Sequence, residues 1–254
     1  MYVYGTSERL FINSTLGCAS KCSYCYLPSL NYELGASVLD VVNSQTLIEL
    51  VESHPEFTPG KNGTIISLGC YSECWDDVVR QSTLELIEYF LIRKNSVQFA
   101  TKRYIAHTHL EKIVPHISWK GQLCIFISSS TISKWKNVEH GTESPEKRFE
   151  GFKSTEIYNI PTYLYLKPIL NNLTLSDLEK YLDVLNEYKV TGVIVGSRFT
   201  KSRIINKNLA PIGEGKLKYC NISNDVDILL LAFSDKIDTY EKSIEAVKHW
   251  RKND

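Results

Sequence analysis

Three of the seven cysteines lie close enough in the chain to share a metal centre. Cys18, Cys22 and Cys25 have the spacing C-x3-C-x2-C. A structural zinc site needs four ligands, commonly with paired C-x2-C spacing, and neither a second such pair nor a His pair at finger spacing follows. Iron-sulfur clusters are held by cysteine thiolates, and a cube with three cysteine ligands keeps one iron open. The spacing therefore favours an iron-sulfur cluster, with zinc and inert structural thiols as the alternatives.

Three further residues that could take part in chemistry lie at the ends of predicted strands. They are Cys70, Lys102 and Ser128. Each also has an ordinary structural interpretation, as a buried thiol, a solvated cation and a polar loop residue respectively. Two other cysteines, Cys74 and Cys220, carry no signal that decides between a role in the site and simple packing.

The elements that must position these residues alternate along the chain. Short apolar runs alternate with helical patterns, which is typical of parallel strands joined by helices. The predicted strands lie near residues 8–13, 64–69, 97–101, 122–128, 161–167, 191–196 and 227–233. The predicted helices lie near residues 41–53, 78–92, 107–114, 145–155, 175–188 and 238–250. Because no Gly-rich dinucleotide fingerprint is present, the sequence predicts an α/β fold of the partial (β/α)6 TIM-like barrel type, with its site at the carboxyl ends of the strands.

The composition is that of one globular domain covering residues 1–254, with 43% hydrophobic and 23% charged residues. We expect the barrel core at about 7–197 and an irregular basic segment, a strand and a helix within 198–254. The 29 basic and 29 acidic residues cancel, which argues against a surface that is basic all over. The longest apolar run, Ile228–Phe233, is too short to span a membrane, and no secretory leader is visible. These features predict a cytoplasmic protein without a membrane partner.

The cysteine segment resembles the signature of the radical S-adenosylmethionine superfamily. The three cysteines have its spacing, and an aromatic residue, Tyr24, precedes the third. Later landmarks resemble the spore photoproduct lyase branch over roughly residues 8 to 196. They are Cys70-Tyr71-Ser72-Glu73, Ala100-Thr101-Lys102, and Glu139-His140-Gly141-Thr142 with Arg148.

This resemblance implies a partial barrel that holds a 4Fe-4S cluster on Cys18, Cys22 and Cys25, with S-adenosylmethionine bound to the open iron. In that superfamily one electron from the cluster cleaves S-adenosylmethionine to methionine and a 5′-deoxyadenosyl radical, which removes a hydrogen atom from the substrate. The cofactors thus supply the radical chemistry, while the protein supplies orientation and excludes competing reactions.

The resemblance also implies roles for individual residues. Tyr24 would pack on the adenine of the cofactor, and the backbone at Tyr26 would read its amino group. Lys102 would contact the cofactor carboxylate, and Ser128 would bind the ribose or the same carboxylate. Cys70 would return a hydrogen atom to the product radical, with Tyr24 and Tyr26 in the radical relay.

The reaction that the resemblance favours is a lyase or DNA repair reaction on a nucleic-acid or nucleotide lesion, with the basic stretch 198–218 on the phosphates. Radical modification of a peptide or a small metabolite is the alternative, and a zinc-binding interaction module without catalysis is the remote one. The resemblance further implies an external electron donor such as a flavodoxin or a ferredoxin.

Overall fold

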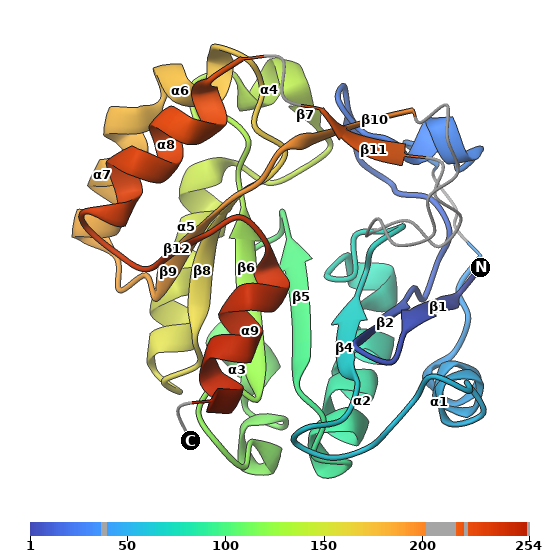
Figure 1. Ribbon diagram of the computed structural model, residues 1–254. Helices are drawn as coiled ribbons and strands as arrows, with labels where there is room; N and C mark the ends of the chain where they lie inside the picture. The colour runs from blue at the N-terminus through green and yellow to red at the C-terminus, as the bar shows by residue number, and fades with distance from the viewer. Residues whose placement is uncertain (37–39, 202–216, 221–222, 253–254) are drawn as a thin grey trace.

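An eight-stranded sheet runs through the centre of the molecule in the order β1-β2-β4-β5-β6-β8-β9-β12 (Figure 1). The computed structural model describes residues 1–36, 40–201, 217–220 and 223–252, with backbone only for 198–201 and 217–220. Neighbouring strands are parallel from β2 to β12, and only β1 is antiparallel to its neighbour. The strands of this sheet are β1 (Val3–Thr6), β2 (Arg9–Ile12), β4 (Ile65–Leu68), β5 (Val97–Thr101), β6 (Leu123–Ser128), β8 (Thr162–Leu166), β9 (Gly192–Val195) and β12 (Thr239–Tyr240). The predicted partial TIM-like barrel is thereby confirmed.

Most of the helices cover the outer face of the sheet, because their apolar sides pack on its buried strands. The helices are α1 (Ser44–Glu52), α2 (Asp77–Ile92), α3 (His107–Leu110), α4 (Trp135–Val138), α5 (Pro145–Glu156), α6 (Leu173–Ser176), α7 (Leu178–Glu187), α8 (Asp225–Ser234) and α9 (Ser243–Lys252), with 3-10 turns at Leu27–Leu30 and Val114–His116. α5 begins as its sequence predicts, since the Ser144 hydroxyl accepts a hydrogen bond from the Lys147 amide and Pro145 follows the cap.

The last helix, α9, lies on the other face of the sheet, in front of β6 in Figure 1. Its apolar residues Ile244, Ala246 and Val247 share one buried cluster with inward-facing side chains of β4, β6, β8 and β9, including Phe126 and Tyr163. The Trp250 indole also donates a 2.7 Å hydrogen bond to the Tyr163 hydroxyl. α9 therefore fills the part of the barrel next to the amino ends of the strands, away from the cavity at their carboxyl ends.

Two predictions for the last quarter of the chain are wrong. Residues 227–233 belong to helix α8 rather than to a strand, because Val226, Leu229 and Phe233 form a buried helical face while Leu231 is exposed. The segment that was predicted to be irregular contains a two-stranded sheet of β10 (Arg198–Lys201) and β11 (Leu217–Cys220). Residues 202–216 lie outside the described residues.

Other boundaries differ by smaller amounts. The helix predicted at 175–188 is divided in two at Asp177, whose carboxylate accepts hydrogen bonds from residues 131–133. The helix predicted at 107–114 ends at Leu110. In the described part of the chain, none of the helices has the length and apolar character needed to cross a membrane.

Candidate active site

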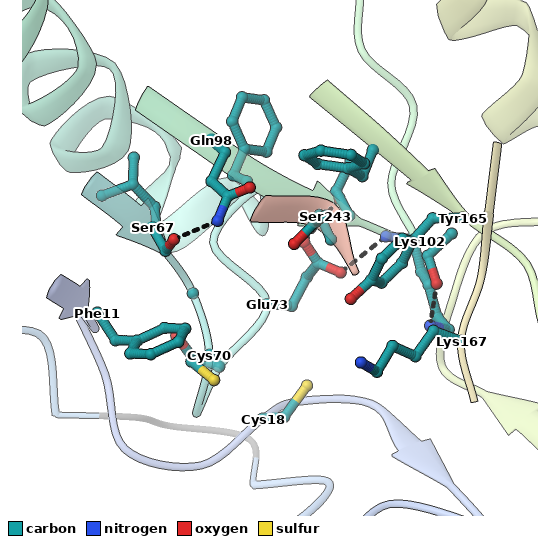
Figure 2. A pocket seen from close by; sticks show the side chains of 18 of the residues that line it. Phe11, Cys18, Ser67, Cys70, Glu73, Gln98, Lys102, Tyr165, Lys167 and Ser243 are labelled. Carbon is teal, nitrogen blue, oxygen red and sulfur yellow. Dashed lines mark hydrogen bonds between the residues drawn. The ribbon is translucent and has the colours of Figure 1, made fainter. Parts of the chain in front are cut away.

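A cavity of about 440 Å³ opens at the carboxyl ends of the central strands. Eight residues that the sequence singled out for a role in catalysis or cofactor binding line it, although they come from four separate segments of the chain. They are Cys18, Cys22, Tyr24, Cys25, Tyr26, Cys70, Lys102 and Ser128. Figure 2 shows the Cys18 and Cys70 side chains pointing into the same space as Glu73 and Lys167. The fold thus brings the predicted site residues together; their individual roles stay predictions.

The cysteine loop is fastened to the barrel by backbone hydrogen bonds. β3 (Lys21–Cys22) pairs with β7 (Glu139–His140), so that Cys22 lies opposite Glu139. Gly17 adopts a φ of 119°, which only glycine adopts readily, and its amide donates to the Tyr71 carbonyl at 3.0 Å. The Cys25 amide donates to the Cys22 carbonyl at 3.0 Å. These contacts hold all three thiols on one side of the cavity.

The donor set fits an iron-sulfur cluster better than a single metal ion. All three cysteines are free and half-buried, and soft thiolates are the ligands that iron-sulfur clusters use. Sulfurs bound to one zinc would lie within about 4 Å of each other, given a zinc-sulfur distance of ~2.3 Å. Among the described residues no three His, Cys, Asp or Glu side chains are arranged to hold a single ion. Burial raises the pKa of the Cys18 thiol to about 11, so cluster binding must displace its proton.

Two predicted cofactor residues, Lys102 and Ser128, contact each other. Lys102 follows β5, Ser128 ends β6, and the Lys102 ammonium donates a 2.6 Å hydrogen bond to the Ser128 hydroxyl. The ammonium also lies 5.8 Å from the centre of the Tyr24 ring. A cation fixed between neighbouring strand ends and an aromatic ring is suited to holding a carboxylate beside a planar group.

A buried, ionised acid, Glu139, lies next to Lys102. Glu139 is fully buried and accepts hydrogen bonds from the Tyr24 hydroxyl and from Arg148, both at 2.6 Å, and its carboxylate is 3.9 Å from Lys102. Burial by itself raises the pKa of Glu139, but the Lys102 and Arg148 cations bring it below its ordinary value. The sequence showed Glu139 and Arg148 only as landmarks of a resemblance, and no local pattern indicated that they would form a buried ion pair.

Cys70 is part of a different cluster of side chains. Gly69 directly follows β4 with a φ of 75°, and a β carbon there would come 2.6 Å from Cβ of Cys74, so the turn to Cys70 requires glycine. The Tyr26 hydroxyl donates to the Cys70 carbonyl at 2.6 Å and is 3.6 Å from the thiol sulfur. Burial raises the pKa of Cys70, although hydrogen bonds from Tyr4 and Tyr26 oppose this. The structure therefore places Tyr26 and Tyr4 on this thiol, while the hydroxyl of Tyr24 contacts Glu139.

Glu73 is a third residue, after Glu139 and Arg148, that appeared in the sequence only as a landmark. Its carboxylate accepts hydrogen bonds from the Thr101 hydroxyl at 2.6 Å and from the Lys102 amide at 2.9 Å. Burial raises its pKa above the ordinary value. Glu73 thus holds the end of β5, and with it Lys102, at the wall of the cavity (Figure 2).

No family model and no curated protein matches the sequence. Solved structures do match. A spore photoproduct lyase variant with bound AdoMet and dinucleoside spore photoproduct is 14% identical, with a TM-score of 0.62, over 92% of this chain and 76% of that chain. Spore photoproduct lyase complexed with the dinucleoside spore photoproduct is 13% identical, with a TM-score of 0.64, over 95% of this chain and 79% of that chain. SuiB of Streptococcus suis bound to S-adenosylmethionine is 14% identical, with a TM-score of 0.59, over 95% of this chain and 52% of that chain. At such identities the likeness shows that these chains share a fold.

Proposed function

We propose that this protein is a radical S-adenosylmethionine enzyme with a 4Fe-4S cluster on Cys18, Cys22 and Cys25. One observation carries the proposal. The three thiols and the Lys102–Ser128 pair line a single cavity, at the strand ends of a fold whose solved examples include proteins with bound AdoMet. When bound, the cluster and S-adenosylmethionine would supply an organic radical that removes a hydrogen atom from the substrate.

The residues of this chain would orient the cofactor and shield the reaction. Lys102, held by Ser128, would bind the cofactor carboxylate through charge-assisted hydrogen bonds. Tyr24 is fixed by Glu139 and would give the adenine a flat aromatic surface. The backbone at Tyr26 would read the adenine amino group. The apolar side chains of Phe11 and Phe126 in the cavity wall would exclude water from a reactive intermediate.

The substrate that we propose is a nucleic-acid or nucleotide lesion. Two observations support it: the fold is shared with a lyase whose structure holds a dinucleoside photoproduct, and a thiol, Cys70, lines the cavity. Cys70 would return a hydrogen atom to the product, and the Tyr26 hydroxyl beside its sulfur is placed to join this transfer. We place Tyr24 at the cofactor rather than next to this thiol, because its hydroxyl contacts Glu139.

An external one-electron donor such as a flavodoxin or a ferredoxin would reduce the cluster. The cytoplasm is the compartment that we propose, because all six described cysteines are free, as they are in reducing compartments. The side chains of the basic residues between 198 and 218 are not described, so their predicted contact with phosphates is part of the proposal only.

The test is a stepwise assay of the anaerobically reconstituted protein. We expect about four irons per chain, as a 4Fe-4S cluster requires, and release of 5′-deoxyadenosine from S-adenosylmethionine with dithionite as reductant. Mass spectrometry should then show conversion of an irradiated thymine oligonucleotide. Absence of 5′-deoxyadenosine from protein with a full cluster would overturn the enzyme assignment. Release of 5′-deoxyadenosine without oligonucleotide conversion would overturn the lesion substrate alone and favour a peptide or a small metabolite.

A further inference from the structure

Three cations besides Lys102 line the cavity, and they come from distant parts of the chain. Arg9 begins β2, Lys167 follows β8, and Lys242 immediately precedes α9. They are close enough to influence each other. Burial, and then the charges of Arg9 and Lys242, lower the pKa of Lys167 to about 8. The fold therefore concentrates positive charge on one part of the cavity wall.

The charges of Arg9 and Lys242 are not taken up by ion pairs within the described part of the chain. The Arg9 guanidinium lies 4.5 Å from the centre of the Phe11 ring, and neither it nor the Lys242 ammonium forms an ion pair there. Two acids lie nearby. Glu8 pairs with Lys248, and Glu245 accepts a hydrogen bond from the Lys242 backbone amide at 3.1 Å. The charge of Glu245 raises the pKa of Lys167, but by less than Arg9 and Lys242 each lower it. Clustered like charges repel each other, and a bound anion would relieve the repulsion.

A buried amide on the same wall also lacks part of its hydrogen bonding. Gln98, on β5, is 3% exposed, and its amide nitrogen donates to the Ser67 hydroxyl at 2.5 Å. Its carbonyl oxygen has no partner in the described structure. The strand register places Ser67 beside Phe11, over which Arg9 lies. Figure 2 shows Phe11, Ser67 and Gln98 along one side of the cavity. A buried carbonyl without a donor is costly, so this wall is suited to a ligand that supplies an N–H or O–H group.

We propose that Arg9, Lys167 and Lys242 bind an oxyanion of the substrate, a phosphate or a carboxylate, while Gln98 accepts a hydrogen bond from the same molecule. This rests on the proposed function, because the cavity is taken as the substrate site. The cofactor carboxylate does not need these residues, since Lys102 and Ser128 are assigned to it. The substrate is thus an anion with a hydrogen-bond donor, and both a nucleotide and a peptide or amino-acid derivative have this chemistry.

Paired probes test the anion subsite in the reconstituted protein with S-adenosylmethionine present. Calorimetric titration compares thymidine 5′-monophosphate with thymidine, and N-acetylalanylalanine with its C-terminal amide. We expect the charged member of one pair to bind about tenfold more tightly than its neutral counterpart, the gain for a charge-assisted contact. Preference in the nucleotide pair identifies phosphate as the source of the oxyanion, and preference in the dipeptide pair identifies carboxylate. Equal binding of both members in both pairs, or no binding of any probe, overturns the subsite.

Variants link the preference to the named cations. Arg9→Gln and Lys242→Gln should each reduce it by about threefold or more, as expected for loss of one charge beside the ligand. Lys153→Gln removes a 57% exposed cation on α5 and should leave it unchanged. An unreduced preference in both cavity variants overturns the proposal. Lys242 is exposed, so Lys242→Gln should fold. Its effect on the anion preference therefore tests the subsite even where Arg9→Gln fails to fold.

Titration of the wild-type protein with S-adenosylmethionine separates the two proposals. Anion preference without S-adenosylmethionine binding overturns the proposed function and leaves the subsite standing. S-adenosylmethionine binding without anion preference overturns the subsite and leaves the proposed function standing.

Discussion

The Tyr24 hydroxyl donates a 2.6 Å hydrogen bond to Oε1 of Glu139, although the two residues are 115 positions apart in the chain. The other carboxylate oxygen of Glu139 accepts from Arg148 on α5, whose side chain is also fully buried. Glu139 therefore connects the cysteine loop to the barrel, and its negative charge is balanced by two cations. Removing the acid would leave Arg148 as a buried charge without its partner.

Glu139→Gln is expected to lower the free energy of unfolding by about 3 kcal/mol, within the range for breaking one partner of a buried ion pair. Tyr24→Phe removes one hydrogen bond to a charged group and should cost about 1.5 to 2 kcal/mol. Denaturant unfolding measures both. The control is Glu146→Gln on the exposed side of α5, which should stay within about 0.5 kcal/mol of the wild type. Equal effects of Glu139→Gln and Glu146→Gln would contradict the buried ion pair.

Replacement of any one of Cys18, Cys22 or Cys25 by alanine is expected to abolish stable cluster binding, because the cube would keep too few thiolate ligands. Iron and sulfide are measured per chain after anaerobic reconstitution. Cys124→Ala is the matched control, since Cys124 lies in the core within β6 and should not affect the iron content. A full complement of about four irons in any of the three variants would argue against the assignment of the ligands.

Lys102→Ala should weaken S-adenosylmethionine binding by about 1 to 3 kcal/mol, the loss expected when a charged hydrogen-bond donor is removed. Ser128→Ala should weaken it less, because the ammonium remains and loses only its anchor. Equilibrium titration gives the dissociation constants. Lys120→Ala serves as the comparison, as this exposed cation lies against Trp250 rather than in the cavity. Affinity as high in Lys102→Ala as in the comparison would show that Lys102 does not contact the cofactor.

Cys70→Ala is expected to change the products without stopping S-adenosylmethionine cleavage, since the cleavage needs the cluster side of the cavity and only the closing hydrogen transfer needs the thiol. Mass spectrometry of irradiated oligonucleotide treated with each protein records the products. Cys74→Ala is a close control because this neighbouring thiol is buried and directed at the Ala100 carbonyl, 3.9 Å away. Identical product distributions for wild type and Cys70→Ala would eliminate Cys70 as the hydrogen donor.

Asp177→Asn should destabilise the fold by about 2 kcal/mol at neutral pH, because a carboxylate that accepts several hydrogen bonds is lost. Burial raises the pKa of Asp177, but hydrogen bonds from Ser133 and Thr131 bring it below its ordinary value. A lowered folded pKa means that the stabilisation is complete above the ordinary Asp pKa and is lost as the pH falls through the folded value.

The difference in unfolding free energy between wild type and Asp177→Asn should therefore shrink below about pH 4, near the ordinary Asp pKa. Asp183→Asn, at an exposed position of α7, is the control and should have little effect at any pH. A gap between wild type and Asp177→Asn that stays constant from neutral to acid pH would show that the charge of Asp177 is not the source of its effect.

The parts of the site that could be predicted from the sequence are those with local signals. The cysteine spacing is visible within eight residues, and Cys70, Lys102 and Ser128 follow apolar runs that form buried parallel strands. Parallel strands end at one edge of the sheet, so residues at their carboxyl ends had to meet. Six predicted strands are confirmed, because each is a buried apolar run that can be seen in the sequence. They are β2, β4, β5, β6, β8 and β9.

What could not be predicted depends on contacts between distant segments. The apolar run in α8 suits a helix as well as a strand, and only its packing against β9 and α6 decides. Asp177 ends one helix and begins another because it binds residues 131–133, which no sequence window contains. Arg9 looks like an ordinary charge at the start of a strand. Its place in the cavity wall follows from the arrangement of the sheet, which brings Arg9 of β2 and Lys242 after β12 to the same cavity.

The position of α9 inside the barrel has a consequence for biosynthesis. Ile65 on β4 leaves the ribosome about 180 residues before its partner Ile244, which corresponds to roughly 10 to 40 s of translation at typical elongation rates. In the later part of this interval, once Phe126 and Tyr163 have been synthesised, their inner faces lack the helix that covers them in the finished protein. The nascent chain therefore exposes an apolar surface that ribosome-associated chaperones can bind, and the cavity acquires its floor only when α9 has emerged.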